Sequence, residues 1–246
     1  MCGRFSLIAD DKDMAAFMGE LLSEAFGPNM PPRYNIAPTQ PIAIVTAGPS
    51  GQKEGVLARW GFVPSWVKDP KSFTLLINAR SETAAEKPSF RKAMRHRRVL
   101  VPASGFYEWQ RFGKGQKSQA YWVRPRGGSM VAFGGLMETW AGGDGSEVDT
   151  ACIISTAANH SFSAIHHRLP LVVQPADFDQ WLDCKTQEPR DIEHLLKPAP
   201  DDFFEAIPIS DAVNKVSNTS PSIQDRTTEE PRVAKVDAAD DQMSLF

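Results

Sequence analysis

The feature that most constrains the fold is a series of short apolar runs separated by glycine, proline, asparagine and aspartate. Runs of this length, rich in β-branched and aromatic residues, are typical of strands. Helical patterns are fewer, and they do not alternate with the runs as in a doubly wound sheet. We therefore expect an α+β fold dominated by antiparallel sheet, with strands over 42–46, 55–61, 98–102, 119–124, 130–137, 149–155, 169–173 and 203–209.

One amphipathic helix is predicted over residues 10–26, where apolar residues recur at helical spacing. Asp10 or Asp11 is the expected N-cap, and Gly27-Pro28 ends the pattern. Further helices are expected over 83–94, 176–183 and 189–197.

Composition divides the chain into a body and a tail. With 41% hydrophobic residues, the 246-residue chain can bury a sizeable core. Residues 220–246 are polar and hold six acids against three bases, whereas the rest of the chain balances at 24 against 24. We expect one folded domain over 2–219 and a disordered acidic tail over 220–246.

Within the body, positive charge is concentrated in one segment. Lys87–Arg126 contains eleven lysines and arginines and a single acid, Glu108. Such a segment can form a basic surface that neutralises phosphates, or it can be an ordinary solvated face. Composition alone leaves both interpretations open.

Cysteine usage and hydropathy predict a cytoplasmic protein. An odd number of cysteines without a CxxC pair argues against a disulfide framework. No apolar run approaches the length of a membrane span, and the first residues lack a signal-peptide pattern. The histidines and cysteines do not show metal-ligand spacing, and no glycine-rich phosphate loop occurs, so we expect no metal and no cofactor.

Cys2 carries the most distinctive chemistry in the sequence. Because Cys2 is small, we expect Met1 to be removed, which leaves an α-amine and a thiol on one residue. Unperturbed, these groups titrate near pH ~8 and ~8.5. An aldehyde is their natural target, because the amine can form an imine and the thiol can then close a five-membered thiazolidine ring. The alternative is that Cys2 is a small buried hydrophobe.

Six blocks of sequence occur in one order along the chain. Together they resemble the SRAP family, whose bacterial and human members crosslink to abasic sites in single-stranded DNA. The resemblance runs from residue 2 to about residue 210. The blocks are MCGRF at 1–5, RYNIAPTQ at 33–40, WGFVPSW at 60–66, INARSET at 77–83, VPASGFYEW at 101–109 and IHHRLP at 165–170.

The resemblance implies a fold and an activity. The implied fold is a single barrel-like domain of mostly antiparallel sheet with flanking helices, and with Cys2 at the floor of a basic groove. The implied activity is a thiazolidine crosslink between Cys2 and the ring-opened aldehyde of abasic sites, which shields the lesion during replication. The protein is then an enzyme-like, nucleoid-associated DNA-damage protein, and whether it also has lyase or peptidase activity stays open.

Position by position, the resemblance makes Cys2 the nucleophile, Asn78 and Glu108 its neighbours, and His166 a second acid/base group. A carboxyl group beside the amine can shuttle the protons that imine formation requires. An imidazole that titrates near pH 7 can assist opening of the closed sugar. His167 stands where the family usually has an acid, and it is the alternative acid/base group.

DNA contacts are expected beside the reactive positions. Arg4, Arg80 and Arg168 adjoin them in sequence, and a guanidinium is the expected partner of a backbone phosphate. Trp66 is expected to stack on exposed bases, and Trp60 is expected in the core.

Other functions fit parts of the sequence. An N-terminal-nucleophile amidohydrolase also begins Met-Cys-Gly, and a thiol protease is a related possibility; both would use Cys2. A noncatalytic reader of modified DNA would use Cys2 only structurally. Glutamine hydrolysis, peptide cleavage and purely reversible DNA binding distinguish these three functions.

The last five residues, 242–246, read QMSLF. They resemble the short peptides by which bacterial replication and repair proteins dock on the β sliding clamp. A polar tail that ends in Leu245 and Phe246 exposes two bulky apolar side chains unless a partner receives them. Gln242 is expected to hydrogen-bond at the rim of the same pocket. Chance occurrence, or folding of the tail back onto its own domain, is the alternative.

Overall fold

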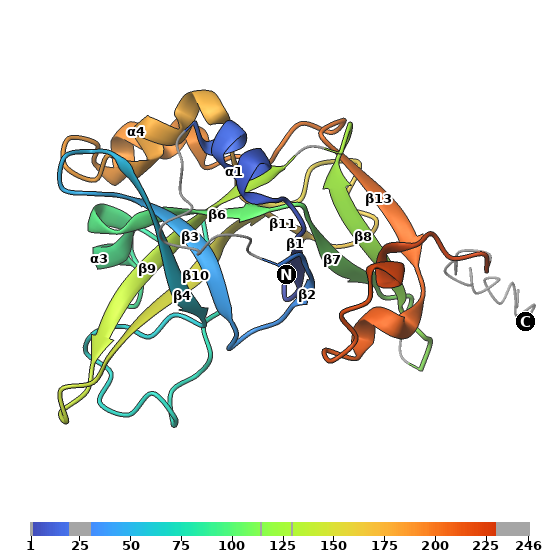
Figure 1. Cartoon of the computed structure of the whole chain (residues 1–246), viewed down its shortest axis with the longest axis horizontal. Helices are drawn as coiled ribbons and strands as arrows, with labels where there is room; N and C mark the ends of the chain where they lie inside the picture. The colour runs from blue at the N-terminus through green and yellow to red at the C-terminus, as the bar shows by residue number, and fades with distance from the viewer. Residues whose placement is uncertain (1, 20–30, 114, 129, 230–246) are drawn as a thin grey trace, which may run out of the picture.

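The computed structural model describes residues 2–19, 31–113, 115–128 and 130–229. Two sheets make up the body: an eight-stranded sheet that contains a closed ring, and a five-stranded antiparallel sheet beside it (Figure 1). Within the described ranges, no helix has the length and apolarity that a membrane span requires.

Five of the described strands close into the ring. Strand β10 completes it, because β10 pairs with β9 on one side and with β4 on the other. The β4–β10 pairing is parallel, and the other pairings in the ring are antiparallel. The expected barrel-like, mostly antiparallel sheet is therefore confirmed. The strands are β3 (Pro41–Ala47), β4 (Lys53–Trp60), β6 (Arg98–Ala103), β9 (Val131–Ala141) and β10 (Glu147–Ala157).

Three short strands extend the ring. Strand β5 (Asn78–Arg80) runs parallel to β10, and β11 (Arg168–Pro170) runs antiparallel to it. Strand β12 (Val172–Val173) pairs with β9. Together β5 and β11 bring two segments far apart in sequence to the same end of β10.

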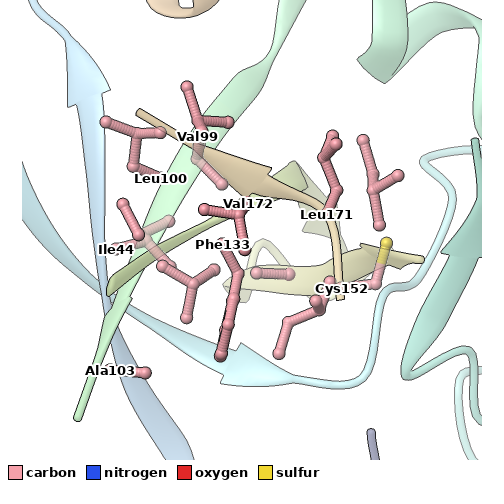
Figure 2. Close-up of a cluster of buried hydrophobic side chains, with 14 of the residues drawn as sticks. Ile44, Val99, Leu100, Ala103, Phe133, Cys152, Leu171 and Val172 are labelled. Carbon is pink, nitrogen blue, oxygen red and sulfur yellow. The ribbon is translucent and has the colours of Figure 1, made fainter. Parts of the chain in front are cut away.

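The buried cluster drawn in Figure 2 takes its side chains from β3, β6, β9, β10 and the segment at Leu171 and Val172. Packing is tight at Gly135 in β9, where a Cβ atom would lie 2.9 Å from the Cys152 carbonyl oxygen and 3.1 Å from a methyl group of Val99. Only glycine avoids that overlap, so its place in the strand follows from the space available.

The second sheet packs one face on the ring and keeps a small core on the other. On the first face, Phe5 meets Trp60 edge to face at 5.1 Å, and Phe106 meets Phe133 at 6.0 Å. The core on the other face contains Tyr107, Ala120, Trp122, Ile207, Ile209, Val213 and Ile223. The strand order is β13 (Phe204–Ile209), β8 (Gln119–Pro125), β7 (Gly105–Gln110), β1 (Phe5–Leu7) and β2 (Arg33–Ile36).

The helices are shorter than the sequence predicts. Helix α1 (Asp11–Met18) has Asp10 as its N-cap, as expected, and the rest of its predicted span, from residue 20 on, lies outside the described residues. Over the predicted 83–94, only α3 (Arg91–His96) is α-helical. Pro88 disfavours helical backbone at the residue before it, and turns precede α3. The other helical segments are η1 (Pro175–Asp177), α4 (Phe178–Leu182), η2 (Pro189–Leu195), η3 (Asp211–Asn214) and η4 (Pro221–Gln224).

Each of the eight predicted runs contains strand, although 169–173 is divided into β11 and β12. Strands β1, β2, β5 and β7 were not predicted. They are three to six residues long, and hydrogen bonds to the neighbouring strands of the sheets stabilise them.

The predicted disordered tail begins too early. Helix η4 lies within it, Ile223 is fully buried, and Gln224 donates a hydrogen bond to the Tyr107 hydroxyl at 2.8 Å. Arg226 forms a β-bridge with Ile209. These contacts extend the folded domain past residue 219, because Ile223 completes the small core; residues 230–246 lie outside the described ranges.

Arg98 is a buried cation that joins the ring to the helices beside it. Its side chain is 1% exposed, and its Nη1 donates to the Met94 carbonyl at 2.9 Å. Its Nε donates to the Trp181 carbonyl at 2.7 Å, and its Nη2 donates to those of Asp183 and Gln187 at 2.8 and 3.1 Å. One guanidinium thus holds α3, α4 and the following turn against β6.

We expect Arg98→Met to lower the free energy of unfolding by about 3 kcal/mol or more. The substitution removes buried charge-assisted hydrogen bonds and leaves the carbonyl groups that accepted them without a donor. Urea denaturation measures the change. Arg91→Met is the matched control, since Arg91 is exposed on α3, and its effect should stay within about 0.5 kcal/mol. Equal effects of the two substitutions would contradict the structural role of Arg98.

Candidate active site

The pairing of β1 with β7 brings Cys2 next to Glu108. Phe5 stands opposite Phe106, and the Tyr107 amide donates to the Arg4 carbonyl at 2.9 Å. Extending this register one residue beyond Arg4 and Tyr107 places Gly3, the residue after Cys2, opposite Glu108. Both side chains are buried, Cys2 at 2% and Glu108 at 5% exposure. A nucleophile and a carboxylate therefore share one water-poor environment.

The loop that carries His166 packs on the same face of β7 as Glu108. Alternate residues of a strand share a face, and the neighbours of Glu108 on its face both contact this loop. Phe106 packs on Phe162 at 5.8 Å, and Gln110 donates to the Ala164 carbonyl at 2.9 Å. The carboxyl group of Glu108 thus lies on the strand face that the His166 loop covers.

Asn78 lies on β5, close to the N-terminal segment. The Trp60 indole donates to the carbonyl of Ile77 at 3.0 Å, and Trp60 also packs on Phe5. Asn78 donates from Nδ2 to the Ile153 carbonyl at 3.4 Å. Its Oδ1 is buried and accepts no hydrogen bond within the part of the chain that the structure describes. A buried acceptor of this kind is ready for an N–H or O–H donor.

Burial makes the Cys2 thiol a weak acid. Burial, and then the charge of Glu108, raises the pKa of Cys2 to about 12. The thiol is therefore protonated at neutral pH, whereas the sequence led us to expect an ordinary thiol that titrates near 8.5. Its Sγ lies 3.8 Å from the Arg4 carbonyl oxygen, which accepts a weak hydrogen bond from it.

His166 is held by the backbone two residues further on. Its Nδ1 accepts a hydrogen bond from the Arg168 amide at 3.0 Å and lies 3.3 Å from the Arg168 carbonyl oxygen. Burial lowers the pKa of His166, against an opposing effect of the Glu108 charge. Burial therefore favours the neutral ring, and His166 takes up a proton less readily than an ordinary imidazole.

His167 lies outside this environment. It is exposed and stacks on His166, with ring centroids 4.3 Å apart and planes inclined by 28°. The Glu108 charge acts on His166, so the structure favours His166 over His167 as the group that belongs to the site.

Of the three arginines, Arg80 is the one with an open side chain. It is exposed on β5, two residues from Asn78 and therefore on the same side of the strand. Arg168, by contrast, is buried and grips Glu82 with two hydrogen bonds of 2.6 and 2.8 Å. The Arg168 hydrogen bonds are the main cause that lowers the pKa of Glu82 to about 2. The expected phosphate contact of Arg168 is not supported, because its guanidinium is already occupied.

Arg4 also has internal partners. Its Nη1 donates to Asn35 Oδ1 at 2.7 Å and to the Val213 carbonyl at 2.9 Å. Its guanidinium carbon lies 6.0 Å from the centroid of the Trp109 ring. Arg4 therefore has an internal role, and its expected phosphate contact stays a prediction. Sequence reasoning gave no role to Asn35, although it lies in one of the six blocks.

The two tryptophans separate as expected. Trp66 is 59% exposed and packs edge to face on Phe73 at 5.6 Å, whereas Trp60 is fully buried. Trp66 is therefore accessible for stacking, and Trp60 is a core residue.

Three of the eleven basic residues of Lys87–Arg126 are buried or paired within the protein. Arg98 is buried, Arg95 pairs with Glu188, and Arg124 pairs with Glu205 at 2.6 Å. These three residues fit neither interpretation of the charge, because each of them is buried or paired with an acid.

Comparison with known proteins places the chain in a family. Residues 1–216 match the family described as SOS response associated peptidase (SRAP). The abasic site processing protein YoqW of Bacillus subtilis is 36% identical over 225 residues, which cover 91% of this chain and 98% of that protein. The abasic site processing protein YedK of Escherichia coli is 29% identical over 223 residues, covering 89% and 96%.

A solved structure agrees with the fold. A protein from Bacteroides thetaiotaomicron superimposes with a TM-score of 0.79 at 26% sequence identity, covering 92% of this chain and 100% of that one. With a family match over most of its length and a relative above 30% identity, the chain belongs to the SRAP family.

Proposed function

We propose that this protein forms a covalent thiazolidine crosslink between Cys2 and the ring-opened aldehyde of abasic sites in single-stranded DNA. The crosslink would shield the lesion during replication. The similarity to abasic site processing proteins supports the substrate. The single observation that carries the chemistry is the burial of Cys2 beside Glu108, together with the Oδ1 of Asn78 on β5, which is buried without a partner among the described residues.

The α-amine acts first. Removal of Met1 frees an amine whose unperturbed pKa is about 8, so a useful fraction is neutral near pH 7. The amine nitrogen adds to the aldehyde carbon and gives a carbinolamine, which loses water to form an imine. Glu108 moves the protons for both steps, because a buried carboxyl group beside the amine can take a proton from nitrogen and return it to the leaving hydroxyl.

The thiol acts second. The sulfur adds to the imine carbon, and the thiol proton ends on the imine nitrogen, so that the ring closes without oxidant or reductant. One water leaves over the whole sequence. A thiol with a pKa near 12 keeps its proton until that step, and Glu108 can relay the proton from sulfur to nitrogen.

Asn78 and His166 complete the site in this proposal. Asn78 Oδ1 accepts a hydrogen bond from the Cys2 amine or from a sugar hydroxyl. His166, neutral and protonated on Nε2, donates to the sugar oxygen that becomes a hydroxyl when the ring opens. The two groups hold the aldehyde in place while Glu108 moves protons.

DNA is bound by groups outside the buried seat. Arg80 pairs with a phosphate of the lesion strand, and Trp66 stacks on an unpaired base. An abasic nucleotide lacks base pairing and much of its stacking, so its sugar enters the site at little cost. Selectivity of this kind requires no contact with base edges.

The hydrolytic alternatives fit the site less well. Amidohydrolases and thiol proteases that use cysteine need a thiolate, which a nearby cation or imidazolium stabilises. Here the largest charge effect on Cys2 is that of the Glu108 carboxylate, which opposes thiolate formation, and burial disfavours an imidazolium at His166. A neutral thiol suits addition to an imine better than attack on an amide.

We expect the protein to form a denaturation-resistant adduct with single-stranded DNA that contains one abasic site. A denaturing gel detects the adduct, and intact mass should show both loss of Met1 and the sum of protein and DNA less one water. Cys2→Ala should abolish the stable adduct, because an alanine amine forms only a reversible imine. A stable adduct of the Cys2→Ala variant, or retention of Met1, contradicts the mechanism.

Chemistry and binding should respond to different substitutions. Glu108→Gln should lower the single-turnover rate by about 10²-fold or more with DNA affinity nearly unchanged, because proton transfer alone is lost. Arg80→Ala should weaken binding and its salt dependence, with a nearly normal rate at saturating DNA. Fluorescence anisotropy and quench-flow gels measure the two quantities. Equal losses of rate and affinity in Glu108→Gln would refute its assigned role.

We further propose that the C-terminal residues Gln242, Leu245 and Phe246 dock on the β sliding clamp. They lie outside the described residues, so the proposal rests on the sequence pattern alone. A tail of about twenty residues would tether the domain close to exposed single strands at a fork and raise its local concentration there. Such tethering would keep the protein at the nucleoid.

A peptide of the last ten residues should bind purified β clamp with a dissociation constant on the order of micromolar, about −8 kcal/mol. Replacing Leu245 and Phe246 by Ala should abolish this binding and leave crosslinking to free DNA unchanged. Titration calorimetry with the peptide and the full chain provides the measurement. Absence of binding at high micromolar concentration rules the docking out.

A further inference from the structure

A strap formed by residues 211–227 covers the face of β7 opposite to the active site. It contains η3 and η4, and Val213 and Ile223 anchor it in the small core. The family match ends at residue 216, so the second half of the strap lies outside it. Strand alternation separates the two faces: Glu108 points to the site, whereas Tyr107 and Trp109 point to the strap.

The strap makes three polar contacts with residues next to the reactive groups. Gln224 donates to the Tyr107 hydroxyl at 2.8 Å. The Trp109 indole donates to Asn214 Oδ1 at 2.8 Å. The Val213 carbonyl accepts from the Arg4 guanidinium at 2.9 Å. Tyr107 and Trp109 flank Glu108 in sequence, so the strap holds the segment that carries the carboxyl group.

Arg4 links the strap to Cys2. Its guanidinium is fixed on the strap side, and its own carbonyl oxygen receives both the Tyr107 amide and the Cys2 thiol. A displacement of Arg4 would therefore move the hydrogen-bond partner of the thiol.

Asn35 forms a second link between Arg4 and the strap, beside the direct bond from Arg4 to Val213. It is 4% exposed, and its Oδ1 accepts from Arg4 at 2.7 Å. Its Nδ2 faces three strap carbonyls, those of Val213 at 3.3 Å, Lys215 at 3.2 Å and Asn218 at 2.8 Å. An amide suits this position because it offers an acceptor to the cation and donors to the carbonyls. An aspartate would set a carboxylate against the carbonyl oxygens, and an apolar residue would satisfy neither side.

We propose that Asn35 is a positioning residue, which clamps Arg4 to the C-terminal strap and thereby sets the position of Cys2 relative to Glu108. The inference rests on the proposed function for its kinetic consequence. The structural part of the inference, that Asn35 sets the position of Cys2, does not depend on which reaction Cys2 carries out. Reactions between held groups depend steeply on alignment, and a displacement of about 1 Å can cost about 10²-fold in rate.

The test compares Asn35→Ala with Gln119→Ala. Gln119 is a matched control, because its buried amide also bonds carbonyls of the five-stranded sheet, those of Ala120 and Ile209. Single-turnover crosslinking at saturating DNA gives the rate, and anisotropy in a Cys2→Ala background gives the affinity. Thermal unfolding sets a temperature at which every variant is fully folded.

We expect Asn35→Ala to lower the saturated rate by about 10- to 100-fold with affinity unchanged, while Gln119→Ala reacts like wild type. If Asn35→Ala does not fold, Asn214→Ala replaces it. Asn214 is exposed, and its substitution removes only the hydrogen bond from Trp109. For Asn214→Ala we expect a smaller loss of the saturated rate than for Asn35→Ala, again without loss of affinity. Wild-type rates in the folded variants, or equal losses in Gln119→Ala, overturn the proposal.

Iodoacetamide labelling separates this inference from the proposed function. Mass analysis of the Cys2 peptide at pH 8 should show slow labelling in wild type and in Gln119→Ala, and at least several-fold faster labelling in Asn35→Ala. Faster labelling without any wild-type adduct on DNA would uphold the clamp and refute the crosslinking function. Unchanged labelling of Cys2 in Asn35→Ala refutes the clamp.

Discussion

The backbone hydrogen bond from Tyr107 to Arg4 is the contact on which the arrangement of the site depends. It fixes the register of β1 on β7, and register determines which residues meet. A slip of β1 by one residue would turn its side chains to the opposite face of the sheet and move Cys2 away from Glu108. Phe5 opposite Phe106, each packed on an aromatic ring of the barrel, makes such a slip costly. The hydrophobic core thus determines the position of the polar groups.

Burial makes the Cys2 thiol a weaker nucleophile, and it also restricts which electrophiles can reach the sulfur. An exposed cysteine near its ordinary pKa would react with oxidants and with many electrophiles. A buried, protonated thiol reacts only with an electrophile that is delivered beside it. In the proposed reaction the α-amine brings the electrophile to the thiol, because imine formation places the electrophilic carbon one ring closure away from sulfur. The specificity of the second step follows from the first.

The sequence predicted the strands of the ring because they are long and rich in β-branched residues. It did not predict β1, β5 and β7, which bear or adjoin Cys2, Asn78 and Glu108, because short segments become strands only when partners supply their hydrogen bonds. Motifs singled out the residues that we propose to react, but the internal partners of two of the arginines lie far away in sequence. Arg168 turns inward to Glu82, a residue 86 positions earlier, and Arg4 turns to Asn35. The altered acidities of Cys2 and His166 come from burial, which local sequence does not encode.

The contact of Arg4 with Val213, 209 positions later, has a consequence for synthesis of the chain. Cys2 leaves the ribosome first, yet its surroundings come from the middle and the end of the chain: Asn78, Glu108, His166 and finally the strap. Until the last of these emerges, the new N-terminus lacks its seat and its proton relay. A partly made chain would therefore be a poor crosslinker, and fragments released by premature termination would not become trapped on damaged DNA.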